Sequence, residues 1–497
     1  MTSGAIGEIG VAKGIKIVII EYIMEIICLK KAWKGGDDMG KIFQNKRPFG
    51  AARTKAISPT KIIALSFAVI IMVGTILLSL PIASRSGVSC GLRPAFFTAT
   101  SATCVTGLTL FDTYSQWSGF GQIVMLLLIE IGGLGFMSAA SLVIFMTGRK
   151  VGLRERMIMA QALSMTDIEG IVRLQKLVLF GSIGVQVTGA VVLFLRFLPD
   201  WGWWTALKWG VFHSVSAFCN AGFDIMGSIP GESSLSAFAS DPVVLFTVSA
   251  LVIMGGLGFP VWQEILSVHS FKKYSVYTKL VLLTSLVLLL TGMGMFCLLE
   301  WNNAATLGSM NLGDKLLNGF FQSVTVRSAG FAAIGQCELT DASKVLTMMM
   351  MLIGGSSGST AGGVKTVTMV VLLLFILSRA RGKASVCVFK RSIPATQVLD
   401  AMTIVSIVVM LAALGTVFIA ATSPVCLQDA LFESMAALTT GGIGTGVTER
   451  LSIAAQYLII IYMYFGRVGV LTISLGFLMG NRAEDRFQYA RAKILIG

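Results

Sequence analysis

The chain has 497 residues, of which 55% are hydrophobic and only 13% are charged, whereas a soluble globular protein carries about 25% charged residues. Its net charge of +14 is compatible with nucleic-acid binding, but the basic residues gather between apolar runs on one predicted side of a membrane, which is a topology signal. The eight cysteines show no CxxC spacing and there are only two histidines, so we expect no disulfide framework, no zinc site and no enzyme.

Residues 1–60 make a basic N-terminal extension that we expect to lie in the cytoplasm, without a secretory signal peptide. Its apolar stretch, Ile15–Leu29, is interrupted by Glu21 and Glu25 and is shorter than the ~20 apolar residues that a membrane span needs. We interpret this stretch as an interfacial or partner-binding helix, or as a poorly ordered segment.

From residue 61 onward, apolar runs long enough to cross a bilayer recur in pairs. In lipid such runs must be helices, because an open strand would leave backbone groups unpaired. The first runs of the pairs cover residues 61–83, 171–198, 276–299 and 399–422, and the second runs cover 119–147, 243–268, 345–378 and 453–480.

Between the two runs of each pair lies a segment in which a Phe is followed ten residues later by a Gly and then by a bulky apolar residue. A second landmark, a Gly-rich step, recurs in each second run. Small residues that allow close helix packing are the simpler explanation for one copy, but four copies at matching intervals favour a repeat. The segments are Phe97–Gly107, Phe212–Gly222, Phe320–Gly330 and Phe432–Gly442, and the Gly-rich steps begin at Gly132, Gly255, Gly354 and Gly466.

The pattern predicts an all-α polytopic membrane protein with four helix–pore-loop–helix repeats around a pseudo-fourfold pore. On this topology, 29 of the 39 Lys and Arg residues fall on one side of the membrane, and this bias places both termini in the cytoplasm of a plasma-membrane protein. The predicted units are the extension 1–60, the repeats 61–150, 165–270, 275–391 and 395–482, and a cytoplasmic tail 483–497.

The four pore segments suit a cation for two reasons. A filter replaces an ion's water shell with backbone carbonyls, and Gly reaches the φ > 0 conformations that turn carbonyls toward an axis. Each pore helix would also point its partly negative C-terminus at the pore. The candidate filter residues are Cys104, Val105, Thr106 and Gly107; Cys219, Asn220, Ala221 and Gly222; Arg327, Ser328, Ala329 and Gly330; and Thr440, Gly441 and Gly442.

Two polar residues within the pore segments have two interpretations each. Arg327 either tunes the filter with its charge or points behind the filter and pairs with a carboxylate or with carbonyls. We favour the second, because a bare guanidinium on the axis would oppose cation entry. His213 is expected to be a hydrogen-bonded packing residue.

The third repeat should contain a gate. Its second run, residues 345–378, would be ~51 Å long as one helix, against a hydrocarbon core of ~30 Å. Five glycines interrupt it, so we expect a break into a loop that can plug the pore, with a packing seam as the alternative. The candidate gate residues are Gly354, Gly355, Ser356, Ser357, Gly358, Ser359, Thr360, Ala361, Gly362, Gly363 and Lys365.

Arg467 lies in the second apolar run of the fourth repeat, at a position where the other repeats carry glycine. A charge on a lipid-facing surface at mid-bilayer costs roughly 2.5–3.5 kcal/mol. We therefore expect Arg467 to face the pore below the filter, as part of the gate. A structural pairing with a carboxylate or with carbonyls is the alternative.

Several motifs make the chain resemble the Trk/Ktr/HKT superfamily of potassium transporters over residues 60–497, and the KtrB type within it, because residues 1–60 lack the two extra spans of Trk-type subunits. In HKT relatives a Ser at the first filter Gly goes with Na⁺ permeation, so Gly107 implies K⁺ held by the filter carbonyls. The fourth segment departs from the commoner Gly-Thr-Val-Gly form. The motifs lie at residues 100–108, 216–223, 327–331, 354–363, 438–442 and 466–469.

The resemblance implies a homodimer in the inner membrane of a bacterium, embedded in lipid, with one pore per protomer. It also implies gating by a cytoplasmic nucleotide-binding RCK ring of the KtrA type, stimulation by Na⁺ as a further ion, and no organic cofactor on this chain. A cation-coupled carrier with alternating access is the competing function, although such folds show inverted repeats. Glu130 is the acidic residue that such a carrier would use first.

Overall fold

The computed structural model describes residues 59–147, 151–162, 170–227, 229, 234–383 and 385–469. The N-terminal extension, the end of the fourth repeat and the predicted C-terminal tail lie outside the described residues. The described part is helical apart from one two-stranded hairpin.

The first repeat begins with the long apolar helix α2, and side-chain caps fix the starts of two of its later helices. Asp112 accepts a hydrogen bond from Ser115 N (2.7 Å) at the start of α4, and Ser118 accepts one from Gly121 N (3.3 Å) at the start of α5. The elements are α2 (Pro59–Ser79), η1 (Pro81–Ala83), α3 (Leu92–Thr103), α4 (Thr113–Gln116), α5 (Gly119–Leu134), α6 (Phe136–Met146) and α7 (Leu153–Ala162).

In the second repeat a single element, α8 (Ile171–Phe218), contains both the outer helix and the pore helix. The chain turns between them at Gly202, whose φ of 71° is not helical, three residues after Pro199. The remaining elements are η2 (Ser236–Phe238), α9 (Pro242–Leu257), α10 (Phe259–Ser267) and η3 (Phe271–Lys273).

The third and fourth repeats follow the same order of outer, pore and inner helix. The third contains α11 (Val276–Glu300), α12 (Leu312–Thr325), α13 (Asp341–Leu352), α14 (Thr366–Ala380) and the antiparallel hairpin of β1 (Cys387–Val388) and β2 (Arg391–Ser392). The fourth contains α15 (Ala395–Thr422), α16 (Leu427–Leu438), η4 (Thr448–Arg450) and α17 (Ile453–Val468).

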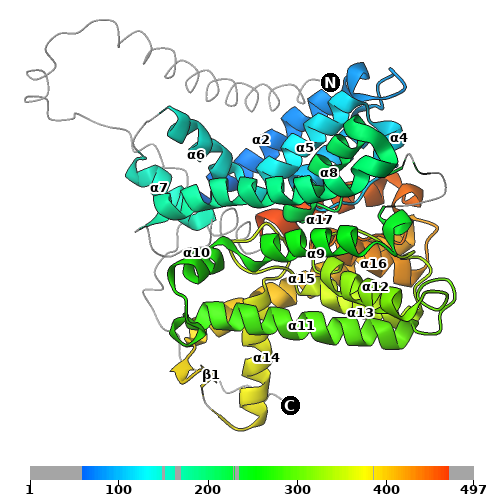
Figure 1. Ribbon diagram of the computed structural model, residues 1–497. Helices are drawn as coiled ribbons and strands as arrows, with labels where there is room; N and C mark the ends of the chain where they lie inside the picture. Colours follow the sequence, from blue (N-terminus) through cyan, green and yellow to red (C-terminus); the bar gives the residue numbers. More distant parts are fainter. Residues whose placement is uncertain are drawn as a thin grey trace, which may run out of the picture. The chain divides into compact units, whose positions relative to one another are not determined.

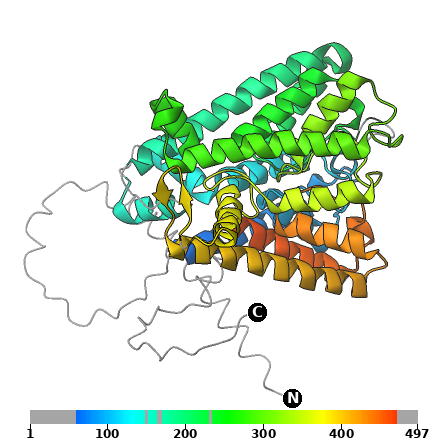
Figure 2. The same ribbon diagram turned by 90° about the horizontal axis from the view of Figure 1, so that it is seen from below.

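Four helices, α2, α8, α11 and α15, are each long and apolar enough to cross a membrane. Their outward faces are apolar as well: on α2 the side chains of Leu65, Val69 and Met72, spaced along one face, are 50–58% exposed, as expected for a surface that meets lipid. In both views α8, α9 and α11 run in a common direction, whereas α14 lies across them (Figures 1 and 2).

The inner runs of the first and second repeats are broken, which the sequence analysis did not expect. Both were predicted as continuous helices over 119–147 and 243–268, but α5 ends at Leu134 and α9 at Leu257. The next residues, Gly135 and Gly258, have φ of 84° and 92°, which only Gly adopts without strain. The chain bends by 93° between α9 and α10.

Glycines also let the helices approach closely in the core. A Cβ on Gly292 of α11 would lie 2.6 Å from Cε of Met350 on α13 and would also clash with Ser323 on α12. Two residues further along α11, Gly294 has no atom within 4 Å of the position of its Cβ. The same helix therefore has one glycine that packing requires and one that it does not.

Gly292→Leu should destabilise the protein by about 1–3 kcal/mol, because it overpacks the contact of α11 with α12 and α13. Gly294→Leu is the matched control and should leave stability nearly unchanged. Thermal unfolding of the detergent-purified variants measures the difference. Equal unfolding midpoints for both variants would contradict this packing.

Candidate functional site

The four pore helices end in one common backbone turn. At each end, a non-glycine residue with positive φ is followed two residues later by a glycine with positive φ. A non-glycine residue with positive φ is uncommon, so four of them at equivalent positions define a motif. The first positions are Val105, Asn220, Ser328 and Thr440, with φ of 49–62°, and the glycines are Gly107, Gly222, Gly330 and Gly442, with φ of 71–92°.

Hydrogen bonds back to the pore helices hold these turns. Thr106 N donates to Ser101 O, and in the second repeat Ala221 N donates to Ser216 O, each at 2.8 Å. The fourth repeat has the equivalent bond from Gly441 N to Ala436 O, also 2.8 Å. Each bond occupies a helix-terminal carbonyl that would otherwise lack a partner.

The four glycines meet one another, and we call them the four-glycine ring: Gly107, Gly222, Gly330 and Gly442. A Cβ on Gly107 would lie 3.3 Å from the Cα atoms of both Gly222 and Gly442, and one on Gly330 would lie 2.9 Å from Gly222 Cα. The ring therefore has no room for side chains and brings four stretches of bare backbone together. The C-terminal, partly negative ends of four helices converge on it.

Two hydroxyls next to the ring are left without partners. Among the described residues, the buried Oγ1 atoms of Thr106 and Thr440 make no hydrogen bond. Both belong to the predicted filter segments, so these oxygens add to the polar atoms near the ring.

The other predicted residues of the pore segments lie around the ring. Arg327 lines a small cavity with Val252 and Gly256 of α9 and Ser285 of α11, and its buried Nε makes no hydrogen bond among the described residues. Cys104 and Ala329 are buried. His213 is buried and its Nδ1 is 2.7 Å from Trp209 O, the hydrogen-bonded packing arrangement expected for it.

The chain between α13 and α14, residues 353–365, forms what we call the Gly-rich loop. Its backbone closes on itself through Gly354 N to Val364 O (2.9 Å). It also lies against the fourth pore turn, because a Cβ on Gly363 would be 2.8 Å from Thr439 O and one on Gly362 would meet Thr440. All of the predicted gate residues from Gly354 to Gly363 are in this loop.

The break between α9 and α10 holds the other side of the loop. Ser356 N donates to Gly256 O at 3.0 Å, and Phe259 N donates to Gly358 O at 2.9 Å. Thr360 Oγ1 reaches the end of the second pore helix at Phe218 O, at 3.0 Å. The broken inner helix of the second repeat thus supplies backbone partners for the loop of the third.

Arg467 bridges three elements at this level. From α17 its guanidinium donates to Thr360 O in the loop and to Gly132 O and Gly133 O at the end of α5, the last at 2.8 Å. Lys365 donates to Ala361 O at 2.8 Å. Both side chains line a cavity of about 310 Å³ that also touches Gly133, Gly358 and Gly363.

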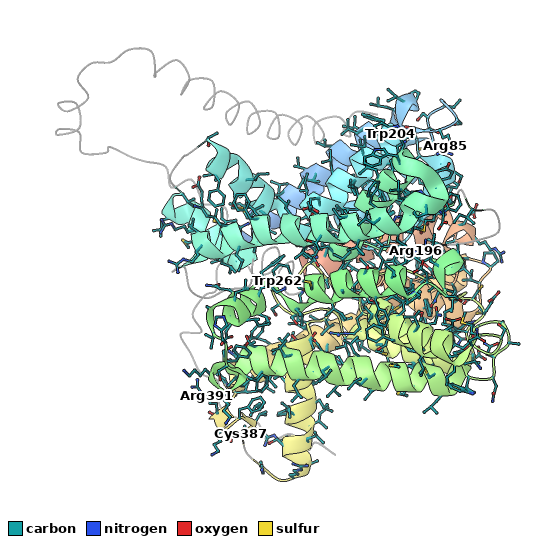
Figure 3. The ribbon with its side chains drawn as sticks, in the orientation of Figure 1. Arg85, Arg196, Trp204, Trp262, Cys387 and Arg391 are labelled. Atoms are coloured by element: carbon teal, nitrogen blue, oxygen red, sulfur yellow. The ribbon has the colours of Figure 1, made fainter. Side chains whose placement is uncertain are left out.

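The sequence analysis missed one contact of the loop. Tyr277, in the first turn of α11, donates its hydroxyl to Ser357 O at 2.9 Å. It lies 80 residues from its partner, and a tyrosine at the end of a long apolar run carries no signal of such a role. In Figure 3, three labelled residues mark this end of the molecule: Trp262 of α10, and Arg391 and Cys387 of the hairpin near α14.

Comparisons with known proteins agree with this architecture. The family model described as TrkH, cation transport protein, matches residues 42–486. The chain is 38% identical to "Potassium/sodium uptake protein NtpJ" of Enterococcus hirae, over 89% of this chain and 98% of that protein. It is 36% identical to "Ktr system potassium uptake protein B" of Bacillus subtilis, over 86% and 95% of the two chains.

A solved structure has the same fold. The potassium transporter TrkH of Vibrio parahaemolyticus superposes with a TM-score of 0.65 over 86% of each chain, at 19% sequence identity. The prediction of an all-helical membrane protein that is not an enzyme is therefore confirmed. The chain belongs to the TrkH family of cation transport proteins.

Proposed function

We propose that this chain carries K⁺ across the bacterial plasma membrane through a pore whose narrowest outer part is the four-glycine ring. The observation that carries the proposal is the convergence of four equivalent backbone turns on one ring of glycines. The names of relatives at 33–38% identity, which describe potassium uptake, support the ion assignment.

The chemistry of the ring suits a weakly hydrated cation. Backbone carbonyls can replace the water shell of K⁺, and the four helix C-termini around the ring add partial negative charge. The three heavy atoms nearest to the Cβ position of each ring glycine are all backbone atoms. Na⁺ is a further candidate ion, since one relative is named for both.

The Gly-rich loop and Arg467 form the gate in this proposal. The loop lies beside the fourth pore turn, and Arg467 donates to it and to α5 at the same level. An ion that leaves the ring would meet the loop backbone and a fixed positive charge. Opening then requires the loop to give up its hydrogen bonds to α9, α10, α11 and Arg467.

The proposed assembly is a homodimer embedded in lipid, with both termini in the cytoplasm and a nucleotide-binding RCK ring on the cytoplasmic side. The word "system" in the names of the Bacillus subtilis relatives supports a multi-subunit assembly. The excess of Lys and Arg in the segments assigned to the cytoplasm supports the orientation.

Tracer flux into liposomes that contain the purified protein tests the proposal directly. K⁺ flux that exceeds Na⁺ flux and runs down either gradient without a coupled ion is the expected result. Strict stoichiometric coupling of K⁺ to a second ion would instead favour the cation-coupled carrier with alternating access. Absence of K⁺ flux would overturn both.

Gly107→Ser should reduce the K⁺/Na⁺ flux ratio by about tenfold, a loss of about 1.4 kcal/mol of discrimination. The added side chain has no room in the ring and strains a residue with φ of 92°. Gly91→Ser is the matched control, because Gly91 also has positive φ but no atom within 4 Å of the position of its Cβ. An unchanged flux ratio in Gly107→Ser would refute the filter assignment.

Arg467→Gln should raise K⁺ flux at least about threefold, because removing the charge need lower the barrier by only about 0.7 kcal/mol. Glutamine can still donate to one carbonyl, so the loop keeps a partner. Initial flux rates in liposomes measure the effect, with Arg450→Gln on the exposed η4 turn as the control. If a correctly assembled Arg467→Gln protein conducts at the wild-type rate, the charge is not a barrier.

Tyr277→Phe should favour the open pore about fivefold, because it removes one hydrogen bond of about 1 kcal/mol that holds the loop. The aromatic ring of residue 277 is kept, so its packing is unchanged. Tyr274→Phe is the matched control. Tyr274 lies three residues before Tyr277, and its aromatic ring packs on Phe271. Flux without the regulatory partner is the measurement, and equal rates in both variants would show that Tyr277 does not restrain the loop.

A further inference from the structure

Glu130 of α5 carries a carboxyl group on the side of the helix that faces outward. Ile123 and Leu127, which lie seven and three residues before it, are 59% and 57% exposed, and Glu130 itself is half-buried. An ionisable group at this depth in a membrane is costly and needs partners. The gate and the four-glycine ring described above do not use it.

Two buried side chains from the second repeat bind the same oxygen of Glu130. Gln186 of α8 donates its Nε2 to Oε2 at 2.8 Å, and the thiol of Cys219 donates to Oε2 at 3.3 Å. No ion pair of Glu130 is found in the described part of the chain. The carboxyl group is therefore held by hydrogen bonds from an amide and a thiol.

Cys219 is the residue at which the second pore helix ends. The next residue, Asn220, has the positive φ of 59° that begins the turn toward Gly222. The thiol has little freedom, because a Cβ on Gly133 of α5 would lie only 2.6 Å from its sulfur. The hydrogen bond to Glu130 thus fixes the side chain that immediately precedes a strained residue.

This arrangement is peculiar to one quarter of the pore. Counted from the Gly-rich steps, the positions equivalent to Glu130 in the other repeats are Ile253, Leu352 and Tyr464. The carboxyl group cannot then be a general requirement of the fold.

We propose that Glu130 is a positioning residue for ion selectivity, which holds the second filter turn through the thiol of Cys219. The inference rests on the proposed function, since it assumes that the turn beginning at Asn220 lines the ion path. Glu130 itself does not touch the ion. Its carboxyl group keeps Cys219 in one orientation, and Cys219 keeps the carbonyls of the following residues aimed at the axis.

The test compares K⁺ and Na⁺ tracer fluxes of full-length variants in liposomes. Glu130→Leu and Cys219→Ala should each lower the K⁺/Na⁺ flux ratio about fivefold to tenfold, because each removes the hydrogen bond between these two side chains. The double variant should lose no more than the larger of the two single losses, since both changes break that one contact. Glu130→Gln, which keeps an acceptor, should lose less than Glu130→Leu.

Leu127→Ala, one turn away on the same outward face, is the matched control and should keep the wild-type ratio. Additive losses in the double variant, or unchanged ratios with only a lower total flux, would overturn the proposal and assign Glu130 a purely structural role.

If Glu130→Leu does not assemble, two variants at position 219 test the proposal instead. Cys219→Ser keeps a donor and should lose less K⁺/Na⁺ discrimination than Cys219→Ala. Equal flux ratios in both variants would overturn the proposal. Wild-type protein without K⁺ flux would be a failure of the proposed function instead.

Discussion

Backbone groups that leave a helix within a membrane must find partners inside the protein, and this constraint shapes most of the structure described here. The chain leaves helical geometry at each of the four pore turns and within the inner runs. The pore turns bond back to the ends of their own pore helices, and the Gly-rich loop bonds to the broken inner run of the second repeat. The Gly-rich loop shows this best, since its peptide groups bond to Gly255, Gly256 and Phe259 of the neighbouring repeat. A break in one repeat is thus stabilised by a break in the next.

The same constraint explains why the pore is only approximately fourfold. The four turns share their backbone conformation, because a ring of glycines requires it. The side chains behind the turns differ: Cys219 bonds to Glu130, His213 to Trp209 O, and Arg327 lies between α9 and α11. In the proposed pore, the common backbone would set the kind of ion that the ring suits, while the unequal surroundings would tune each quarter separately.

Much of the fold was predictable from the sequence, because the backbone of each repeat requires glycine at fixed positions and those glycines recur at regular spacing. The spacing from Phe to Gly in each pore segment led to the right helices, and α11 and α15 end within a few residues of the predicted runs. The breaks at Gly135 and Gly258 were missed, because bulky residues follow those glycines at once and no local feature distinguishes a bend from a packing glycine. The Gly-rich loop lies against Gly258, whose Cβ position is 2.8 Å from Ser357 O, whereas no atom lies within 4 Å of the Cβ position of Gly135.

Contacts between distant residues were the part that sequence could not supply. Tyr277 and Ser357 are 80 residues apart, and Glu130 and Cys219 are 89 apart, so no spacing rule joins them. The sequence did single out Arg467 as a charge at mid-membrane, and it left open whether that charge acts on the ion or pairs with carbonyls. The geometry makes these two roles compatible, because the guanidinium lines the cavity while donating to Thr360, Gly132 and Gly133.

That double role has a consequence for how the gate could work. A guanidinium bound to three carbonyls satisfies backbone groups at the ends of broken elements, so it cannot move away without leaving them unpaired. The loop keeps its own bond from Gly354 N to Val364 O whether or not its bonds to the second repeat are present. In the proposed gate the loop is the element that moves, and Arg467 with the end of α5 is the fixed surface against which it closes. Motion of the loop away from Arg467 would then widen the free cross-section of the pore and remove the Thr360 carbonyl from the guanidinium, so the steric barrier would fall while the electrostatic barrier of the fixed charge would rise.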